Sequence, residues 1–178
     1  MTTLPAAELP LCRALNRWGA RSIVHGFFAT VSRLGDGVFW YALMAALPIA
    51  GGWRGAAASA HLAVTGLATL ALYRMLKRRI RRPRPCVSDR GIIARVPPLD
   101  QFSFPSGHTL HAVAFTAIAC AWYPSLALLL VPFSALVALS RVVLGLHYPS
   151  DVAAALAIGA LLAAGSLAGL TALGGIPA

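Results

Sequence analysis

The sequence predicts an all-α fold, a polytopic membrane helix bundle of about five transmembrane helices, or six, with an N-terminal helix in the membrane interface. Of the 178 residues, 58% are hydrophobic, only 11% are charged, and the mean hydropathy is +0.74. A soluble domain usually carries about 25% charged residues. The apolar residues also gather in stretches close to the ~20 residues that a spanning helix needs. The length fits one domain over residues 1–178.

The first elements are an amphipathic segment and an interrupted apolar stretch. Residues 10–21 place leucines and Trp18 on one face and arginines largely on another, which is typical of a helix in the interface. The start of the chain has no basic segment followed by an apolar core, so no cleavable signal peptide is expected. Residues 22–51 are apolar except at 33–37, which predicts one long tilted helix or a helix broken at its glycines.

The remaining spans are separated by one long loop and two short turns. A polar, basic loop is expected over residues 77–103, and a turn breaks the chain at 146–150. With about five spans, the N-terminus, this loop and this turn all lie on one side of the membrane. The four later spans are predicted at residues 55–76, 105–122, 125–145 and 149–172.

The net charge of +10 does not indicate nucleic acid. The basic residues lie between apolar runs, with no aromatic-interleaved RNA motif or zinc spacing beside them. Anionic membrane lipids and a phosphorylated lipid substrate explain the charge better. The odd number of cysteines gives no disulfide framework, and Cys12, Cys86 and Cys120 form no metal-ligand spacing.

Three short strings carry most of the polar chemistry. Together they supply three fixed cations, two histidines and one carboxylate, and the predicted topology brings them to one face. Arginine and lysine suit phosphate oxygens, and a helix start with a glycine provides free N–H groups for an anion. The strings therefore predict a phosphate site. They are Lys77-x6-Arg84-Pro85, Pro105-Ser106-Gly107-His108 and Ser140-Arg141-x5-His147-x3-Asp151.

The histidines suit phosphoryl transfer. His147 and Asp151 are four residues apart at a helix start, so the carboxylate can accept from one imidazole nitrogen while the other attacks phosphorus. His108, from another helix, can protonate the leaving oxygen. Fixed cations can neutralise the developing charge, so no metal and no cofactor is expected.

These strings make the chain resemble the type 2 phosphatidic acid phosphatase (PAP2) family, the membrane branch of a superfamily that includes vanadium haloperoxidases. The resemblance covers residues 77–151. It implies that His147 is the nucleophile of a phosphohistidine, Asp151 its orienting partner and His108 the general acid. The haloperoxidases are soluble, so bound vanadate and peroxide chemistry are not expected. The implied phosphate-binding residues are Lys77, Arg84, Ser106, Gly107 and Arg141.

The expected function is therefore an integral membrane lipid phosphatase acting on a lipid phosphate monoester or pyrophosphate. Candidate substrates are undecaprenyl pyrophosphate, phosphatidylglycerophosphate, phosphatidate and lipid A phosphates. The alternative is a lipid transporter or a non-catalytic membrane scaffold. The predicted spans do not divide into two symmetric halves, which argues against a transporter. A scaffold would not need His108, His147 and Asp151 together.

The other polar residues are expected to serve structure. His25 and His61 are lone histidines in apolar context, and His111 lies one turn after His108. All three side chains are expected to pack inside the bundle. Asp36 lies near mid-membrane and is expected to form a structural ion pair. Its predicted partner is Arg33, Arg74 or a motif cation. The Gly165-x3-Gly169 string is a weak packing signal. The basic loop residues Arg78, Arg79, Arg81 and Arg82 are expected to be topology signals and lipid contacts.

Two arguments on sidedness disagree. Many members of the resembled family work on the extracytoplasmic face, whereas the positive-inside rule places the motif side in the cytoplasm of a bacterial inner membrane. We follow the charge rule, because the asymmetry persists after the motif cations are removed. The motif side holds Arg13, Arg17, Arg21, the cluster from Lys77 to Arg84, Arg90, Arg95 and Arg141, against little beyond Arg54 on the other side.

Overall fold

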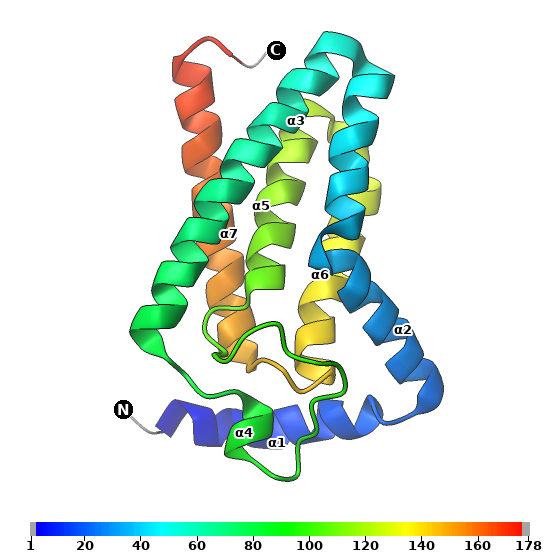
Figure 1. Ribbon diagram of the computed structural model, residues 1–178, viewed down its shortest axis with the longest axis vertical. Helices are drawn as coiled ribbons and strands as arrows, with labels where there is room; N and C mark the ends of the chain where they lie inside the picture. The colour runs from blue at the N-terminus through cyan, green and yellow to red at the C-terminus, as the bar shows by residue number, and fades with distance from the viewer. Residues whose placement is uncertain (1–2, 176–178) are drawn as a thin grey trace.

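The structure, a computed structural model, describes residues 3–175, and every regular element in that range is helical (Figure 1). The all-α prediction is confirmed. The elements are α1 (Thr3–Trp18), α2 (Ser22–Arg33), the π-helix η1 (Leu34–Val38), α3 (Phe39–Ile80), α4 (Pro85–Ser88), α5 (Gly107–Trp122), the 3-10 helix η2 (Pro124–Leu126), α6 (Ala127–Val143) and α7 (Pro149–Ala172).

Helix α1 runs across the lower end of the bundle, roughly perpendicular to α5 and α7 (Figure 1). It begins at Thr3 rather than at residue 10, and it contains Pro10. The side chain of Asn16 ties it to the bundle by donating to the carbonyl oxygens of Ile93 (2.9 Å) and Val143 (3.1 Å). The helix therefore closes the end of the bundle at which the three strings meet.

The first apolar stretch is continuous helix with two bends. The interruption at 33–37 becomes the π-helix η1, in which Gly37 has a φ of 131° that favours glycine. Inside α3, Gly52 (φ 54°, ψ −134°) reverses the chain, so that residues 39–51 and 53–80 form two arms (Figure 1). The serine hydroxyl of Ser59 donates to the carbonyl of Met44 across this hairpin (2.7 Å).

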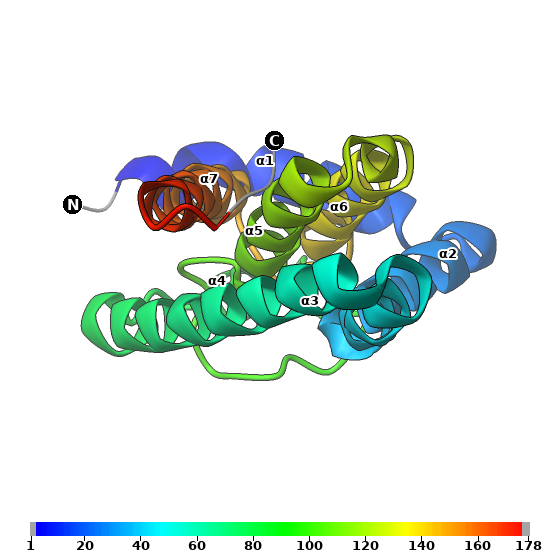
Figure 2. The same ribbon diagram turned by 90° about the horizontal axis from the view of Figure 1, so that it is seen from above.

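Helix α5 is the centre of the bundle and lies between α3, α6 and α7 (Figure 2). Its side chains are buried on several faces, including Leu110, Ile118 and Trp122. A helix that is apolar all round is expected where neighbours surround it. Pro149 in the first turn of α7 and Ser106 at the N-cap of α5 suit the two helix starts at the site.

The helices expose many large apolar side chains. Leu128 and Ile49 are 88% and 87% exposed, and side chains of this kind face lipid rather than water in a membrane protein. Three helical stretches are long and apolar enough to cross a membrane: Ser22–Ser88, which contains the reversal, Pro124–Val143 and Pro149–Ala172. Helix α5 has 16 residues, fewer than the ~20 of a full span. The count of five spans therefore stays a prediction.

Candidate active site

The three strings converge on one cavity of about 540 Å³ at the lower end of the bundle. They reach it from the end of α3, the loop before α5, the start of α5, the end of α6 and the turn before α7. Two residues that the sequence assigned to the site, Ser106 and Asp151, are buried just behind the lining. The cavity is lined by six of the eight predicted site residues: Lys77, Arg84, Gly107, His108, Arg141 and His147.

Two cations share a carboxylate that sequence reasoning missed. Lys77 Nζ lies 2.5 Å and Arg84 Nη2 2.7 Å from the same oxygen, Oδ1 of Asp100. Burial raises the pKa of Asp100, but the hydrogen bond to Lys77 and the charges of Lys77 and Arg84 outweigh it and hold that pKa below its ordinary value. An anionic oxygen thus lies between the two cations that the sequence assigned to phosphate. No spacing signal in the loop singled out Asp100.

The third cation, Arg141, is buried and faces the cavity from α6. Its Nη1 donates to the hydroxyl of Ser32 on α2. Its Nε has no hydrogen-bond partner among the described residues. A buried guanidinium with an unused donor suits an anion that accepts from it.

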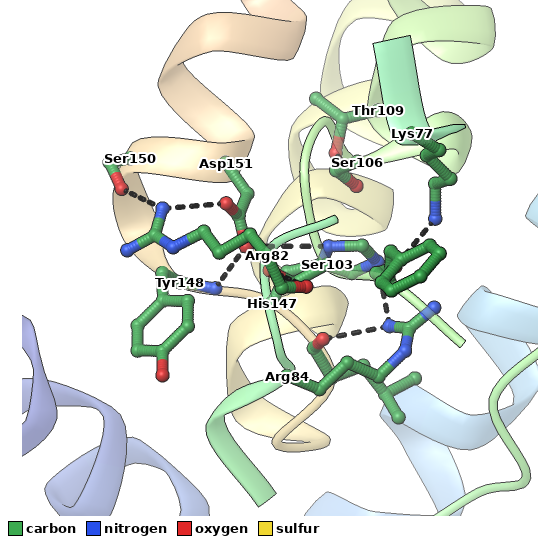
Figure 3. Close-up of polar contacts among 12 residues, drawn as sticks. Lys77, Arg82, Arg84, Ser103, Ser106, Thr109, His147, Tyr148, Ser150 and Asp151 are labelled. Carbon is green, nitrogen blue, oxygen red and sulfur yellow. Dashed lines mark hydrogen bonds and ion pairs between the residues drawn. The ribbon is translucent and has the colours of Figure 1, made fainter. Parts of the chain in front are cut away.

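His147 has the orientation of a nucleophile. Arg84 Nη1 donates to its Nε2 over 3.2 Å (Figure 3), and because arginine only donates, Nε2 carries a lone pair. Burial, followed by the charges of Arg141, Arg84 and Lys77, lowers the pKa of His147 well below its usual value, so the ring is neutral near pH 7. Its other nitrogen, Nδ1, lies 3.7 Å from Asp151 Oδ2. Catalytic contacts are often this long without substrate and tighten in its complex.

Asp151 is held by two other groups. The backbone N–H of Tyr148 donates to its Oδ2 (2.9 Å), and Arg82 Nη1 donates to its Oδ1 (2.7 Å; Figure 3). Arg82 also donates to Ser150 Oγ (2.7 Å) and to Glu8 on α1 (3.1 Å). Its guanidinium lies 3.9 Å from the centre of the Tyr148 ring.

The expectation that Arg82 is a topology signal or lipid contact is therefore wrong. Arg82 is half-buried in the site because the chain turns inward after α3 and remains extended to Arg84. Pro83 and Pro85, which bias their neighbours away from helix, were the only sequence signal of this ordered segment. By contrast, Arg78, Arg79 and Arg81 are exposed.

Asp36 also has a different partner from those expected. Arg33 and Arg74 are exposed, and Asp36 instead contacts His108 Nε2 and lines the cavity. The π-helix η1 adds one residue to the helical turn, so that the carboxylate of Asp36 lines the cavity. The side chain of Arg33 stays exposed at the surface. The prediction that Asp36 is buried against Arg33, Arg74 or a motif cation is therefore wrong, because its partner is His108 and its side chain is 35% exposed.

The smaller polar groups take varied places. The hydroxyl of Ser106 is paired with Thr109 Oγ1 (2.9 Å), so its role as a phosphate donor stays a prediction. His111 Nδ1 donates to the carbonyl of Gly107 (2.9 Å), and its ring packs on aromatic neighbours while lining the cavity. His25 and His61 do not line it. Within residues 3–175, no three His, Cys, Asp or Glu side chains are grouped for a metal.

Comparison with known proteins identifies the family. Residues 57–173, more than half of the chain, match the model of the PAP2 superfamily, so this chain belongs to that superfamily. It shares its fold with the PAP2-type phosphatidylglycerolphosphate phosphatase of Bacillus subtilis, at a TM-score of 0.77 and 22% identity over 94% of this chain and 86% of that one. It also shares its fold with Aquifex aeolicus LpxE, at a TM-score of 0.77 and 24% identity over 90% of this chain and 94% of that one.

Two kinds of curated relative are similar in sequence. A decaprenylphosphoryl-5-phosphoribose phosphatase of Mycobacterium tuberculosis is 42% identical over 91 residues, 51% of this chain and 49% of the relative. A lipid A 1-phosphatase of Rhizobium johnstonii is 36% identical over 105 residues, 57% of this chain and 43% of the relative. The chain thus spans about half the length of the curated relatives it matches or less.

Proposed function

We propose that this chain is an integral membrane lipid phosphatase that cleaves a phosphate monoester or pyrophosphate of a lipid through a phosphohistidine on His147. One observation carries the proposal. A neutral, buried imidazole, whose Nε2 lone pair accepts from Arg84, lies in a cavity whose charged lining includes Lys77, Arg84 and Arg141. A site of this kind stabilises the charge that spreads over the phosphoryl oxygens in the transition state.

The reaction proceeds in two steps. Nε2 of His147 forms a bond to phosphorus while the ester P–O bond breaks, and the leaving oxygen takes its electron pair and a proton from His108. Water then attacks phosphorus, gives a proton to His108, and the P–N bond breaks with its electron pair returning to His147. Asp151 orients the ring and stabilises its cationic form during both steps.

The same cavity supports a lipid as the substrate. Beyond the charged end it is lined by apolar side chains from both arms of α3, among them Trp40, Met44, Leu67 and Leu70. The phosphate would bind the cations while the tail lies along these residues. The relatives named above are phosphatases of decaprenylphosphoryl-5-phosphoribose, lipid A and phosphatidylglycerolphosphate. The candidates for this chain remain undecaprenyl pyrophosphate, phosphatidylglycerophosphate, phosphatidate and lipid A phosphates.

The membrane placement belongs to the same proposal. Five rods cross the bilayer: residues 22–51, residues 53–80, α5, α6 and α7, with α1 in the interface. The inner membrane of a bacterium suits this arrangement. Helix α1 and the C-terminal end of α7 lie at opposite ends of the bundle, which supports an odd number of crossings (Figure 1).

Purified protein is expected to release phosphate from one of these lipids in detergent micelles, and to do so equally in EDTA, because fixed cations neutralise the phosphate. Phosphate release is measured across the lipid panel with and without chelator. A transporter or scaffold would release none from any lipid. Activity that disappears in EDTA and returns with a divalent ion would overturn the metal-free mechanism but not the phosphatase.

The charge rule predicts that the site faces the cytoplasm. Arg90 is exposed in the loop on the site's side of the bundle, so Arg90→Cys, with Cys12, Cys86 and Cys120 replaced, reports the sidedness. We expect an impermeant thiol reagent to label this cysteine only after lysis. The matched control is Trp53→Cys, which is exposed at the opposite end and is expected to label in intact cells. The reverse pattern would place the site outside.

A further inference from the structure

We propose that Asp36 is a positioning residue for the general acid: it holds the imidazole of His108 protonated and aimed into the cavity. The inference rests on the proposed function, because it assigns a second histidine–carboxylate pair to the same phosphoryl transfer. His147 and Asp151 form the first pair, on the nucleophile's side. His108 and Asp36 form the second, on the side of the leaving group.

The geometry of the turn at 34–38 serves this contact. Gly35 lies against Val137, where a Cβ would be 3.0 Å from its side chain, and Gly37 takes a backbone conformation that other residues rarely adopt. Both glycines lie within the π-helix η1, which directs Asp36, the residue between them, to His108 Nε2. π-Helical turns of this kind recur at functional sites. One turn earlier on the same segment, Ser32 accepts from Arg141, so one element supports two residues of the site.

This element lies outside the region that the family model matches, which begins at residue 57. Asp36 is therefore not among the residues that the resemblance assigned. It comes 72 residues before its partner in the chain. The pairing depends on the fold and on no local spacing.

The charges around His108 explain why it needs a carboxylate. The cations of the cavity repel a protonated imidazole, and a general acid must carry its proton before the leaving group departs. Asp100 cannot offset them at His108, because its oxygen is already shared by Lys77 and Arg84. On α7, Asp151 is directed to His147 and Arg82. The charged and titratable groups that line the cavity with His108 are Asp36 (η1), Tyr41, Tyr73 and Lys77 (α3), Arg84 and Asp100 (loop), His111 (α5), Arg141 (α6) and His147 (turn).

Proton transfer can then be followed atom by atom. In the acid form that we propose, His108 donates Nε2–H to Asp36 and carries its second proton on Nδ1. When the P–O bond breaks, the Nδ1 proton passes to the leaving oxygen and His108 becomes neutral. In the second step the attacking water returns a proton to Nδ1 of His108, while Nε2–H stays bonded to Asp36. Asp36 touches no reacting atom, so it acts through His108.

The test compares two substrates with the same tail and different leaving groups, dodecyl phosphate and 4-dodecyl-2-nitrophenyl phosphate. The alkoxide needs protonation, whereas the nitrophenolate leaves without it. We expect Asp36→Asn to lower kcat/KM for dodecyl phosphate by about 10- to 100-fold, part of the ~10²–10⁴-fold that general acid catalysis usually contributes. The same variant should change kcat/KM for the nitrophenyl ester by less than about threefold, because general acid help is no longer required there.

A double-mutant cycle separates action through His108 from a general defect. In a His108→Gln background, Asp36→Asn should have no further effect on dodecyl phosphate. Asp36→Glu, which keeps a carboxylate, should recover part of the activity. The control is Asp89→Asn, which removes only the ion pair with Arg13 at the loop surface and should match wild type on both substrates.

Each outcome has one meaning. The role of Asp36 would be refuted if Asp36→Asn lowered kcat/KM equally for both substrates. It would also be refuted if the fold-losses of Asp36→Asn and His108→Gln multiplied in the double variant. Either result would leave the proposed phosphatase activity intact. Asp36 variants that all fail to fold, judged by size-exclusion chromatography and thermal unfolding, would make Asp36 a structural residue and also overturn the proposal. A wild-type protein that hydrolyses neither substrate nor any lipid of the panel would instead refute the proposed function, and this inference with it.

Discussion

His147→Ala is expected to lower kcat for the lipid phosphate by at least about 10²-fold, because the substitution removes the atom that bonds to phosphorus. The ring is buried, contacts Arg84 through Nε2 and lies on the wall of the cavity. A water molecule cannot replace His147 as the nucleophile, because alanine provides no group beside Asp151 that would orient the water. His108→Ala should lose a comparable factor on a substrate with an alkoxide leaving group.

Two measurements check this expectation. Rapid acid-free quenching with ³²P-labelled substrate should trap an acid-labile phosphoenzyme in the wild type and none in His147→Ala. The matched control is His61→Gln, which changes a partly buried histidine bonded to Ser166 away from the cavity and should keep kcat near that of the wild type. A folded His147→Ala protein that turns over like the wild type would eliminate the phosphohistidine mechanism.

The parts of the fold that follow local rules could be predicted from the sequence. Helix α7 begins at Pro149 as expected, and α5 begins at Gly107, two residues after the predicted start, because proline in the first turn and serine at the N-cap favour helix starts whatever the tertiary packing. The apolar runs predicted the rods of the bundle. The reversal at Gly52 lay between two predicted stretches, and the polar string at 33–37 predicted a bend without its π-helical form.

The residues of each string could be predicted together, because each string spans only a few residues. Their partners could not be predicted in the same way. Asp36 reaches His108 from 72 residues away, and Asp100 reaches Lys77 from 23 residues away. A single charge inside an apolar stretch or a loop has no period that reveals its partner. Only the packing of η1 against α5 and the path of the loop decide which cation or histidine it meets.

Arg82 is the most consequential of these long-range partners, and Arg82→Met is expected to destabilise the protein by about 3–5 kcal/mol, the usual cost of leaving a buried charge without its partner. Asp151 is fully buried, and Arg82 is its single cationic hydrogen-bond partner among the described residues. The substitution also removes the bond to Glu8, which leaves α1 tied to the start of α7 by the two bonds from Ser150 to Glu8. The midpoint of thermal unfolding in detergent should fall accordingly, and kcat should fall with it. Arg79→Met, an exposed neighbour, should change neither.

A second variant separates stability from catalysis at this position. Adding Asp151→Asn to Arg82→Met removes the uncompensated charge, so part of the lost stability should return. Catalysis should not return, because a neutral amide cannot stabilise the cationic form of His147. If Arg82→Met unfolds like the wild type and keeps its turnover, the ion pair is dispensable and Asp151 is held by the N–H of Tyr148 alone. If the double variant regains activity along with stability, Arg82 serves only the fold, and His147 attacks phosphorus without help from a carboxylate.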